Sequence, residues 1–388
     1  MFQARGIPPP QCGPLHRAIG HVQHDAGKTL PLGAASPELG ADAASLKALR
    51  RCKDIPVRSI LTALALAIAL PASAAEQPAY GPRLEGFDYP HPVRTHAFSS
   101  QRQDLEMAYM DIAPTAPANG RTALLLHGKN FCAATWQDTI AALAGAGYRV
   151  IAPDQVGFCK SSKPAHYQFS LAGLADNTHA LLKALGIDKP VVIGHSMGGM
   201  LAIRYALMFP QEVQHLALVN PIGLEDWKSV GVPYQSVDQW YASELKTSFE
   251  RIKQYQMDVY YAGTWRPEFE RWARMQAGLY AGAGKQANAW DQALTDDMVY
   301  SQPVVYEFPR IAVPTTLLIG QLDRTAIGKA AAPAQIQPTL GNYPVLGKRA
   351  ARAIPGARLV EFAELGHSPQ VQDPARFNAA LLQALATP

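Results

Sequence analysis

A short run near the middle of this 388-residue sequence has the residue types of a nucleophilic site. Residues 194–198 read Gly-His-Ser-Met-Gly, with the apolar run 191–193 before them and a helix-like run after them. In a G-x-S-x-G motif with this context, the serine occupies a sharp turn between a strand and a helix and exposes its hydroxyl. The two glycines leave no side chain to crowd the bend. Ser196 is therefore the candidate nucleophile.

A serine hydroxyl is a weak nucleophile and needs a neighbouring base. His367 is the preferred candidate, because it follows the last apolar run of the chain and precedes the last helical segment. That position predicts a loop at the carboxyl edge of a sheet. His127 and His195 adjoin motif positions, which favours structural roles, and His179 falls within a predicted helix. The remaining alternatives are His91, His96, His166 and His215.

The base in turn needs an acid that orients it and stabilises its protonated form. Asp323 follows the apolar run 317–320 and is placed just beyond the end of a predicted strand. The chain order is then serine, aspartate, histidine, which is the order expected for nucleophiles of this motif. Glu225 and Asp226, after the preceding predicted strand, are a weaker alternative.

A tetrahedral intermediate on Ser196 requires N–H donors for its oxyanion. Met197 supplies one backbone N–H, directly after the serine at the start of a predicted helix. The second donor is expected from residues 126–131, Leu-His-Gly-Lys-Asn-Phe, where the Lys129 N–H is favoured and Asn130 is the alternative. The Lys129 side chain is either a charged substrate contact or an ordinary solvated lysine.

The elements that must position these residues alternate between strands and helices. Short apolar runs bounded by Gly and Pro predict strands, and longer runs with apolar side chains at helical spacing predict helices. This alternation predicts an α/β fold with a mostly parallel eight-stranded sheet covered by helices on both faces. The expected strands are Val93–Ser99, Leu105–Ile112, Thr122–Leu126, Arg149–Ala152, Pro190–Ile193, Leu216–Val219, Thr315–Ile319 and Arg358–Phe362. The expected helices are Trp136–Ala144, Leu171–Leu185, Met197–Phe209 and Pro374–Ala386.

The alternation stops between residues 221 and 310. This stretch holds five of the six Trp and eight of the 15 Tyr and predicts several helices with aromatic faces. We expect a helical cap inserted into a core formed by residues 75–220 and 311–388. Most of its aromatic side chains should pack the cap onto the core, and some could line an apolar pocket. The candidates are Trp240, Tyr241, Trp265, Trp272 and Tyr280.

These motifs together resemble those of a known family. The segments that carry the resemblance are His127-Gly128, 153–157 (Pro-Asp-Gln-Val-Gly), 194–199, 320–323 and Gly366-His367. They are similar to the α/β-hydrolase fold family, in its capped type with an HG loop, over residues 94–386. The resemblance implies that Ser196, Asp323 and His367 are nucleophile, acid and base, with no metal or cofactor. Dehalogenases and epoxide hydrolases of this family use an aspartate nucleophile, so the serine argues against both chemistries.

The resemblance also bears on two cysteines. The family segment D-x-x-G-x-G-x-S has Cys159 in place of its second glycine here, and Cys132 lies in the HG loop. In this fold the two loops follow adjacent strands at one edge of the sheet. For an exported protein this placement implies a disulfide between Cys132 and Cys159, with two free thiols as the alternative.

The N-terminal region predicts export. The apolar run 60–70 is too short to cross a bilayer as a helix but has the length of a signal-peptide core. Basic residues precede it, and small residues follow it, which predicts cleavage after Ala74 or Ala75. We expect residues 57–74 to be the signal peptide and 1–56 an unstructured leader, which an alternative start at Val57 would exclude. The alternative for the apolar run is a buried core helix.

The distribution of charge along the chain limits the classes of molecule that the protein is expected to bind. Residues 1–74 carry eight Lys/Arg and four Asp/Glu, whereas the rest of the chain is electrically neutral. No basic stripe for nucleic acid is therefore expected, and the net charge of +4 belongs to the leader. The sequence predicts a periplasmic or secreted serine hydrolase without a stable membrane anchor, acting on a small or medium ester with an apolar part.

Three alternatives to an esterase stay open. The same three residues would support cleavage of an amide or peptide bond, or of a C–C bond beside a carbonyl. A non-catalytic binding module on a hydrolase fold is the alternative of a different class. The oligomeric state is left open.

Overall fold

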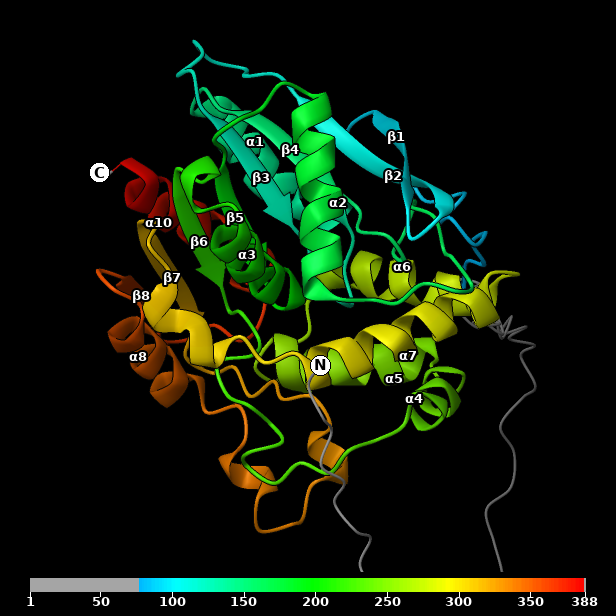
Figure 1. Cartoon of the computed structure of the whole chain (residues 1–388). Helices are drawn as coiled ribbons and strands as arrows, with labels where there is room; N and C mark the ends of the chain where they lie inside the picture. Colours follow the sequence, from blue (N-terminus) through cyan, green and yellow to red (C-terminus); the bar gives the residue numbers. More distant parts are fainter. Residues whose placement is uncertain (1–76, 387–388) are drawn as a thin grey trace, which may run out of the picture. The chain divides into compact units, whose positions relative to one another are not determined.

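The protein, as a computed structural model, is described over residues 77–386 (Figure 1). The leader and the predicted signal peptide, residues 1–56 and 57–74, lie outside the described residues. Within 77–386, none of the helices combines the length and the apolar character needed to cross a bilayer. The centre of this part of the chain is one sheet of eight strands.

The sheet runs in the order β1-β2-β4-β3-β5-β6-β7-β8. The pairs β1–β2 and β2–β4 are antiparallel, and every other neighbouring pair is parallel. This is the mostly parallel eight-stranded sheet that the alternating pattern predicts. Its strands are β1 (Val93–Ser100), β2 (Gln103–Ile112), β3 (Thr122–Leu126), β4 (Arg149–Pro153), β5 (Val191–His195), β6 (His215–Val219), β7 (Thr315–Gly320) and β8 (Arg358–Phe362).

The first hairpin turns more tightly than the sequence pattern indicates. Gln101 and Arg102 have φ values of 51° and 61°, so two residues in the left-handed region connect β1 to β2. Such two-residue turns match the twist of the paired strands. Strand β2 therefore begins at Gln103, two residues before the predicted start at Leu105.

Helices cover both faces of the sheet because successive strand residues point to opposite sides. On β3, Leu124 and Leu126 belong to the core under α2, α3 and α8. Ala123 and Leu125 belong to the second core, under α1 and α10. The covering helices are α1 (Gln137–Gly145), α2 (Leu171–Ala184), α3 (Met197–Met208), α8 (Tyr343–Ala353), α9 (Pro369–Gln372) and α10 (Pro374–Ala386).

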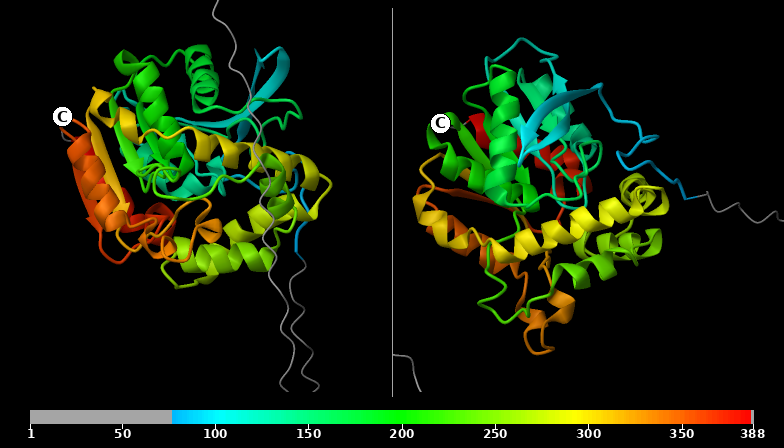
Figure 2. Two further views of the ribbon diagram at one scale, coloured as in Figure 1. Left: turned by 60° about the horizontal axis from the view of Figure 1, so that its bottom comes forward. Right: turned by 45° about the vertical axis from the view of Figure 1, so that its right-hand side comes forward.

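A second set of helices lies between β6 and β7, and we call residues 221–310 the helical insert. Figures 1 and 2 show these helices on the side where the parallel strands end. A π-helical turn, Gln256–Tyr260, follows α5 directly. The helices of the insert are α4 (Val237–Glu244), α5 (Phe249–Tyr255), α6 (Glu270–Ala281) and α7 (Lys285–Ser301).

The carboxyl ends of neighbouring strands bring distant parts of the chain together. Ser196 follows β5 directly, and Asn220 follows β6 directly. Asp323 lies three residues beyond β7, and His367 lies five residues beyond β8. Because β5 to β8 are adjacent and parallel, these four residues meet at one edge of the sheet.

Candidate active site

Ser196 occupies a strained turn between β5 and α3. Its φ and ψ are 57° and −121°, a combination that residues with a side chain rarely adopt. The turn closes only because its glycines allow close backbone contact. A Cβ on Gly194 would lie 2.2 Å from the Gly198 carbonyl oxygen, and one on Gly198 would lie 2.2 Å from the Leu126 carbonyl oxygen. The G-x-S-x-G spacing is thus a packing requirement of this turn.

His367 is paired with Asp323 in a fully buried contact. The Nδ1 atom of His367 lies 2.7 Å from Oδ2 of Asp323, and both side chains have 0% exposure. Asn220 Nδ2 also donates to Oδ2 at 2.8 Å, and the backbone N–H of Thr325 donates to Oδ1 at 2.8 Å. Since the carboxylate only accepts hydrogen bonds here, Nδ1 of His367 carries the proton and Nε2 is left basic.

The basic nitrogen of His367 is available for a proton. Its Nε2 atom is buried and has no hydrogen-bond partner among residues 77–386, so the Ser196 hydroxyl is not bonded to it in this structure. Hydrogen bonds between base and nucleophile are often long in ligand-free enzymes and shorten when substrate binds. His195, the residue before Ser196, hydrogen-bonds through Nε2 to the backbone carbonyl of His367 at 2.9 Å. That bond ties the serine turn to the histidine loop.

His195 and His127, the histidines next to Ser196 and Gly128, make structural contacts. Burial, with the neighbouring His367, lowers the pKa of His195 well below its usual range. His127 accepts a hydrogen bond from the Gln155 N–H at 3.0 Å through Nε2, and its Nδ1 lies 2.9 Å from the Gly128 carbonyl oxygen. Burial also lowers the pKa of His127. Both rings are therefore neutral and hold backbone segments in place.

The alternative acids lie elsewhere. Glu225 accepts a hydrogen bond from the Gly341 N–H at 2.9 Å, and Asp226 accepts one from the Tyr306 hydroxyl at 2.9 Å. Neither carboxylate is bonded to His367. Asp323 is the carboxylate that the fold brings to the histidine.

The loop after β3 packs directly on Ser196. A Cβ on Gly128 would lie 3.0 Å from the Ser196 Cβ, so this position has room only for glycine. The Phe131 N–H bonds to the Gly128 carbonyl at 3.1 Å, which places Lys129 in the middle of a turn. Its backbone N–H donates to no acceptor in the part of the chain that the structure describes. The first N–H groups of a helix, such as that of Met197, also lack partners within the helix.

The side chain of Lys129 is neither solvated nor free. It is 13% exposed and is paired with Glu244 of α4 at 3.2 Å and with Asp296 of α7 at 3.1 Å. Burial alone would lower the pKa of Lys129, but the two carboxylates raise it above its usual value. Burial raises the pKa of Asp296 to about 7, although the neighbouring Lys129 ammonium acts to lower it. This cluster connects the helical insert to the loop expected to bind the oxyanion.

Tyr260 of the helical insert is a site residue that motif reasoning missed. Its ring centroid lies 4.7 Å from that of His367, and its hydroxyl accepts a hydrogen bond from Asn130 Nδ2 at 2.7 Å. Its backbone carbonyl accepts from the Ser368 N–H at 3.4 Å. Burial raises the pKa of Tyr260 well above its usual value, so the phenol stays neutral. The π-helical turn that ends at Tyr260 has no signature in the sequence, although such turns recur at functional sites.

Cys132 and Cys159 form a disulfide with their Cα atoms 5.9 Å apart. It joins the loop after β3 to the loop after β4, its neighbour in the sheet. Cys159 has a φ of 46°, which lies in the left-handed region that glycine adopts most easily. This backbone conformation explains why the family pattern has glycine at the position.

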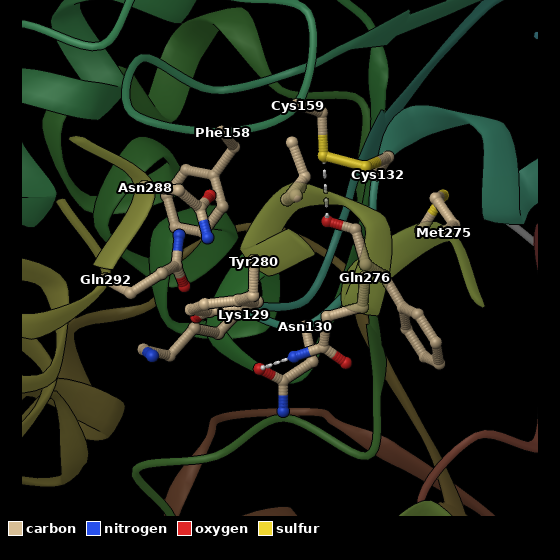
Figure 3. Close-up of a pocket in the computed structure, with 12 residues that line it drawn as sticks. Lys129, Asn130, Cys132, Phe158, Cys159, Met275, Gln276, Tyr280, Asn288 and Gln292 are labelled. Carbon is tan, nitrogen blue, oxygen red and sulfur yellow. Dashed lines mark hydrogen bonds between the residues drawn. A yellow bond between two sulfur atoms is a disulfide. The ribbon is translucent and has the colours of Figure 1, made fainter. Parts of the chain in front are cut away.

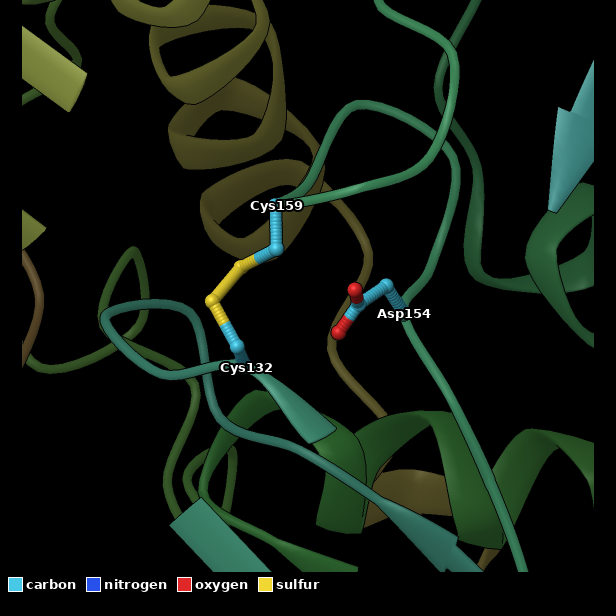
Figure 4. A group of neighbouring side chains, drawn as sticks. All are labelled: Cys132, Asp154 and Cys159. Carbon is cyan, nitrogen blue, oxygen red and sulfur yellow. A yellow bond between two sulfur atoms is a disulfide. The ribbon is translucent and has the colours of Figure 1, made fainter. Parts of the chain in front are cut away.

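The disulfide also determines whether a nearby group of potential metal ligands can bind a metal ion. Cys132, Asp154 and Cys159 place their ligand atoms within 4.8 Å of one another (Figure 4). Metal binding needs thiolates, but both sulfurs are in the disulfide. The Asp154 carboxylate already accepts hydrogen bonds from the Ala133 N–H at 2.8 Å and the Tyr89 hydroxyl at 2.7 Å. These residues therefore do not fit a metal ion.

A small cavity lies beside the loop after β3 (Figure 3). Of the aromatic residues considered for a pocket, Tyr280 lines it, whereas Trp272 packs near Phe87 and Trp265 near Phe269. The lining residues are Lys129, Asn130, Phe131, Cys132, Phe158, Cys159, Met275, Gln276, Leu279, Tyr280, Asn288 and Gln292.

Comparison with known proteins supplies the family context. The sequence profile described as "alpha/beta hydrolase fold" matches residues 124–374. The crystal structure of a "probable hydrolytic enzyme" from Pseudomonas aeruginosa PAO1 is 64% identical in sequence. It superposes with a TM-score of 0.79 over 80% of this chain and 99% of that one.

Two curated relatives have named activities. A 2-hydroxy-6-oxo-6-phenylhexa-2,4-dienoate hydrolase from Burkholderia cepacia is 32% identical over 35% of this chain and 48% of its own. Lipase 1 from Psychrobacter immobilis is 25% identical over 71% of this chain and 82% of its own. The chain spans half or less of the curated relatives that it matches at 32% to 39% identity, between 30% and 48% of their length.

Proposed function

The chain belongs to the α/β-hydrolase fold family, and on that premise we propose that this hydrolase cleaves carboxylic esters through an acyl-enzyme on Ser196. The observation that carries the proposal is the state of His367. Its Nδ1 is held by the buried Asp323, and its buried Nε2 has no partner among residues 77–386. An imidazole whose Nδ1 is held by a carboxylate and whose Nε2 has no partner is suited to take a proton from a nearby hydroxyl.

The proposed reaction has two halves. Nε2 of His367 takes the proton of the Ser196 hydroxyl as the oxygen attacks the ester carbonyl, and Asp323 stabilises the imidazolium that forms. The backbone N–H groups of Met197 and Lys129 bind the oxyanion. His367 then protonates the leaving alcohol, and a water molecule deprotonated by the same nitrogen hydrolyses the acyl-enzyme. No metal ion or cofactor takes part.

The substrate is proposed to be a small or medium ester with an apolar part. The similarity to Lipase 1 supports an ester, although identity is only 25%. The similarity to the Burkholderia hydrolase favours a second candidate, cleavage of a C–C bond beside a carbonyl with the same three residues. Amide cleavage would also use them.

The test is hydrolysis of p-nitrophenyl esters from acetate to decanoate by the full chain and by Ser196→Ala. We expect turnover by the wild type and a loss of at least about 10⁴-fold in the variant. Ser301→Ala, at an exposed position of α7, serves as the control and should keep full activity. Turnover that survives in Ser196→Ala would overturn the proposal.

A fluorophosphonate probe separates the alternatives. Labelling of Ser196 without turnover of any ester would favour amide or C–C bond cleavage. No labelling and no turnover would favour a binding module.

We further propose that the protein is exported to the periplasm or secreted, and that the helical insert acts as a cap. Export is supported by the apolar run 60–70 and by the Cys132–Cys159 disulfide, which is typical of oxidising compartments. The cap is supported by the contacts of Tyr260 and Lys129 described above. N-terminal sequencing of the mature chain tests export, since a mature protein that retains residues 1–50 would contradict it.

A further inference from the structure

The backbone N–H of Lys129 has to be positioned without a hydrogen bond of its own. It is the second donor proposed for the oxyanion, and it donates to no acceptor within residues 77–386. Lys129 lies in the middle of the turn that the Phe131 N–H and the Gly128 carbonyl close at 3.1 Å. Since this N–H must stay free for the substrate, its orientation depends on the neighbouring residues of the turn and on the Lys129 side chain.

The Lys129 side chain is anchored in the helical insert. Its Nζ atom lies 3.2 Å from Oε1 of Glu244 on α4 and 3.1 Å from Oδ2 of Asp296 on α7. The Tyr280 hydroxyl of α6 donates to the other carboxylate oxygen of Glu244. Helices α4, α6 and α7 therefore determine together where the end of this side chain lies.

The next residue of the turn is anchored in the same part of the chain. Asn130 Nδ2 donates to the Tyr260 hydroxyl at 2.7 Å, and Asn130 Oδ1 accepts from Gln276 Nε2 of α6 at 3.0 Å (Figure 3). On its other side the turn packs on the nucleophile, since a Cβ on Gly128 would lie 3.0 Å from the Ser196 Cβ. The turn thus connects the insert directly to the serine.

The ionic character of the Lys129 contact points to a role in positioning. The Lys129, Glu244 and Asp296 side chains are 13%, 17% and 8% exposed, so each has lost most of its contact with water. Apolar side chains of similar volume would often give equal or greater stability in such places. An ion pair away from water is favourable only in a narrow range of geometries, so two carboxylates around one ammonium favour one position of the lysine.

We propose that the helical insert sets the geometry of the oxyanion site through the ion pairs of Lys129 with Glu244 and Asp296. The Lys129 ammonium is a positioning group, because it acts on the reaction through the backbone N–H of the same residue. The inference rests on the proposed esterase function and deepens it. It makes full stabilisation of the tetrahedral intermediate depend on α4 and α7 being in place.

The kinetics of Lys129→Met and Lys129→Arg test the proposal. Methionine removes the charge from a side chain of similar shape, whereas arginine keeps the charge. The assay is run at pH 8, above the pKa of about 7 that burial gives Asp296, so that this carboxylate is ionised. With p-nitrophenyl butyrate, we expect kcat of Lys129→Met to fall by about tenfold to 10²-fold with little change in KM, as for a misplaced donor. Lys129→Arg should recover most of the loss.

A transition-state mimic separates positioning from a general loss of structure. An alkyl trifluoromethyl ketone adds to a reactive serine, and the oxyanion of the adduct needs the same two N–H donors as the tetrahedral intermediate. Its Ki should rise in Lys129→Met by the factor by which kcat/KM falls. A contact that only stabilises the fold would leave Ki unchanged in the folded variant.

Variants of the carboxylates complete the test. Glu244→Gln and Asp296→Asn each leave Lys129 one partner, so each should lower kcat less than Lys129→Met does. The triple variant Lys129→Met/Glu244→Gln/Asp296→Asn leaves no charge of this cluster unpaired, and we expect it to fold with nearly wild-type stability. It should still show the loss in kcat, and it replaces Lys129→Met if that variant does not fold.

Arg204→Met is the matched control. Arg204 of α3 pairs with Glu307 of the helical insert, with Nη1 and Oε1 3.1 Å apart, and the two side chains are 22% and 24% exposed. This ion pair also joins the core to the insert, but it is not bonded to the turn that contains Lys129. Its removal should leave kcat and Ki unchanged.

Two outcomes would overturn the inference. Wild-type kcat and Ki in folded Lys129→Met or in the triple variant would show that the ion pairs only attach the insert. An equal loss in Arg204→Met would show that any contact between insert and core has this effect. Absence of ester turnover and of fluorophosphonate labelling in the wild type would instead be a failure of the proposed function, and the inference would fail with it.

Discussion

Asp323 accepts hydrogen bonds from three groups, and these bonds determine which nitrogen of His367 is basic. Motif and position alone were sufficient to select Asp323 and His367, because each follows a recognisable apolar run at a strand end. Asn220, which also holds the carboxylate, could not be selected in this way. It is 103 residues from Asp323 in sequence, and a single asparagine after a strand has no distinguishing pattern.

The same limit explains why Tyr260 was not anticipated. The sequence marks the region 221–310 as rich in aromatic residues, but it does not say which ring reaches His367. That contact depends on the π-helical turn and on the packing of the insert against the histidine loop. Lys129 illustrates the reverse case, since its backbone position was predictable but its two carboxylate partners, Glu244 and Asp296, were not.

Tyr260→Phe tests the polar link between the helical insert and the loop after β3. The ring that packs on His367 is retained, and only the acceptor for Asn130 Nδ2 is lost. We expect kcat for ester hydrolysis to fall about tenfold with little change in KM, which corresponds to one buried hydrogen bond. Steady-state kinetics on p-nitrophenyl esters measure the effect.

Tyr234→Phe is the matched control, because Tyr234 is 61% exposed. An unchanged kcat in Tyr260→Phe, or a change confined to KM, would show that the Tyr260 hydroxyl does not support the reacting groups.

At the scale of secondary structure, the limits of the strands were largely predictable, whereas for the insert only its place in the chain and its helical character were. Gly and Pro bound the apolar runs of the parallel strands, so observed and predicted limits differ by no more than two residues in β3 to β8. Helix α8 was not predicted, although it covers β7 and β8. The helices of the insert have less regular apolar spacing, and their limits depend on contacts with each other and with the core.

The Cys132–Cys159 disulfide joins the loop after β3 to the loop after β4, across 27 residues of sequence. Closing a loop of this length is expected to stabilise the fold by about 3 to 4 kcal/mol, mainly by restricting the unfolded chain. The double variant Cys132→Ser/Cys159→Ser should lose that amount in urea denaturation. Wild-type protein unfolded in the presence of reductant should then match the variant. Equal stability of the wild type with and without reductant would contradict the expectation.

For the molecule as a whole, the contact between the helical insert and the core includes a buried group that titrates, the Asp296 carboxyl beside Lys129. Burial raises the pKa of Asp296 to about 7, whereas an unfolded aspartate titrates near 4. The folded state therefore retains the proton between about pH 4 and pH 7. Over this range the contribution of Asp296 lowers the free energy of unfolding as the pH rises, and the loss is complete above pH 7.

Asp296→Asn should not show this decrease in the free energy of unfolding, because its amide does not titrate. We expect the Tm of the variant minus that of the wild type to become more positive from pH 5 to pH 8, as measured by thermal denaturation in matched buffers. Asp297→Asn, at the next and less buried position, controls for the general effect of removing a carboxylate. A difference that stays constant with pH would show that Asp296 is ionised throughout this range.

The close approach of Tyr260 to the histidine loop limits which substitutions the two segments can accept during evolution. A Cβ on Gly366 would lie 2.5 Å from the Tyr260 carbonyl oxygen, so the backbone of the insert occupies the space that any other residue at 366 would need. A side chain at 366 therefore requires the backbone of the insert to shift at Tyr260. Transplanting the insert between homologues should therefore succeed only when the donor also contributes the short stretch that precedes the histidine, and the two would be expected to co-vary through descent.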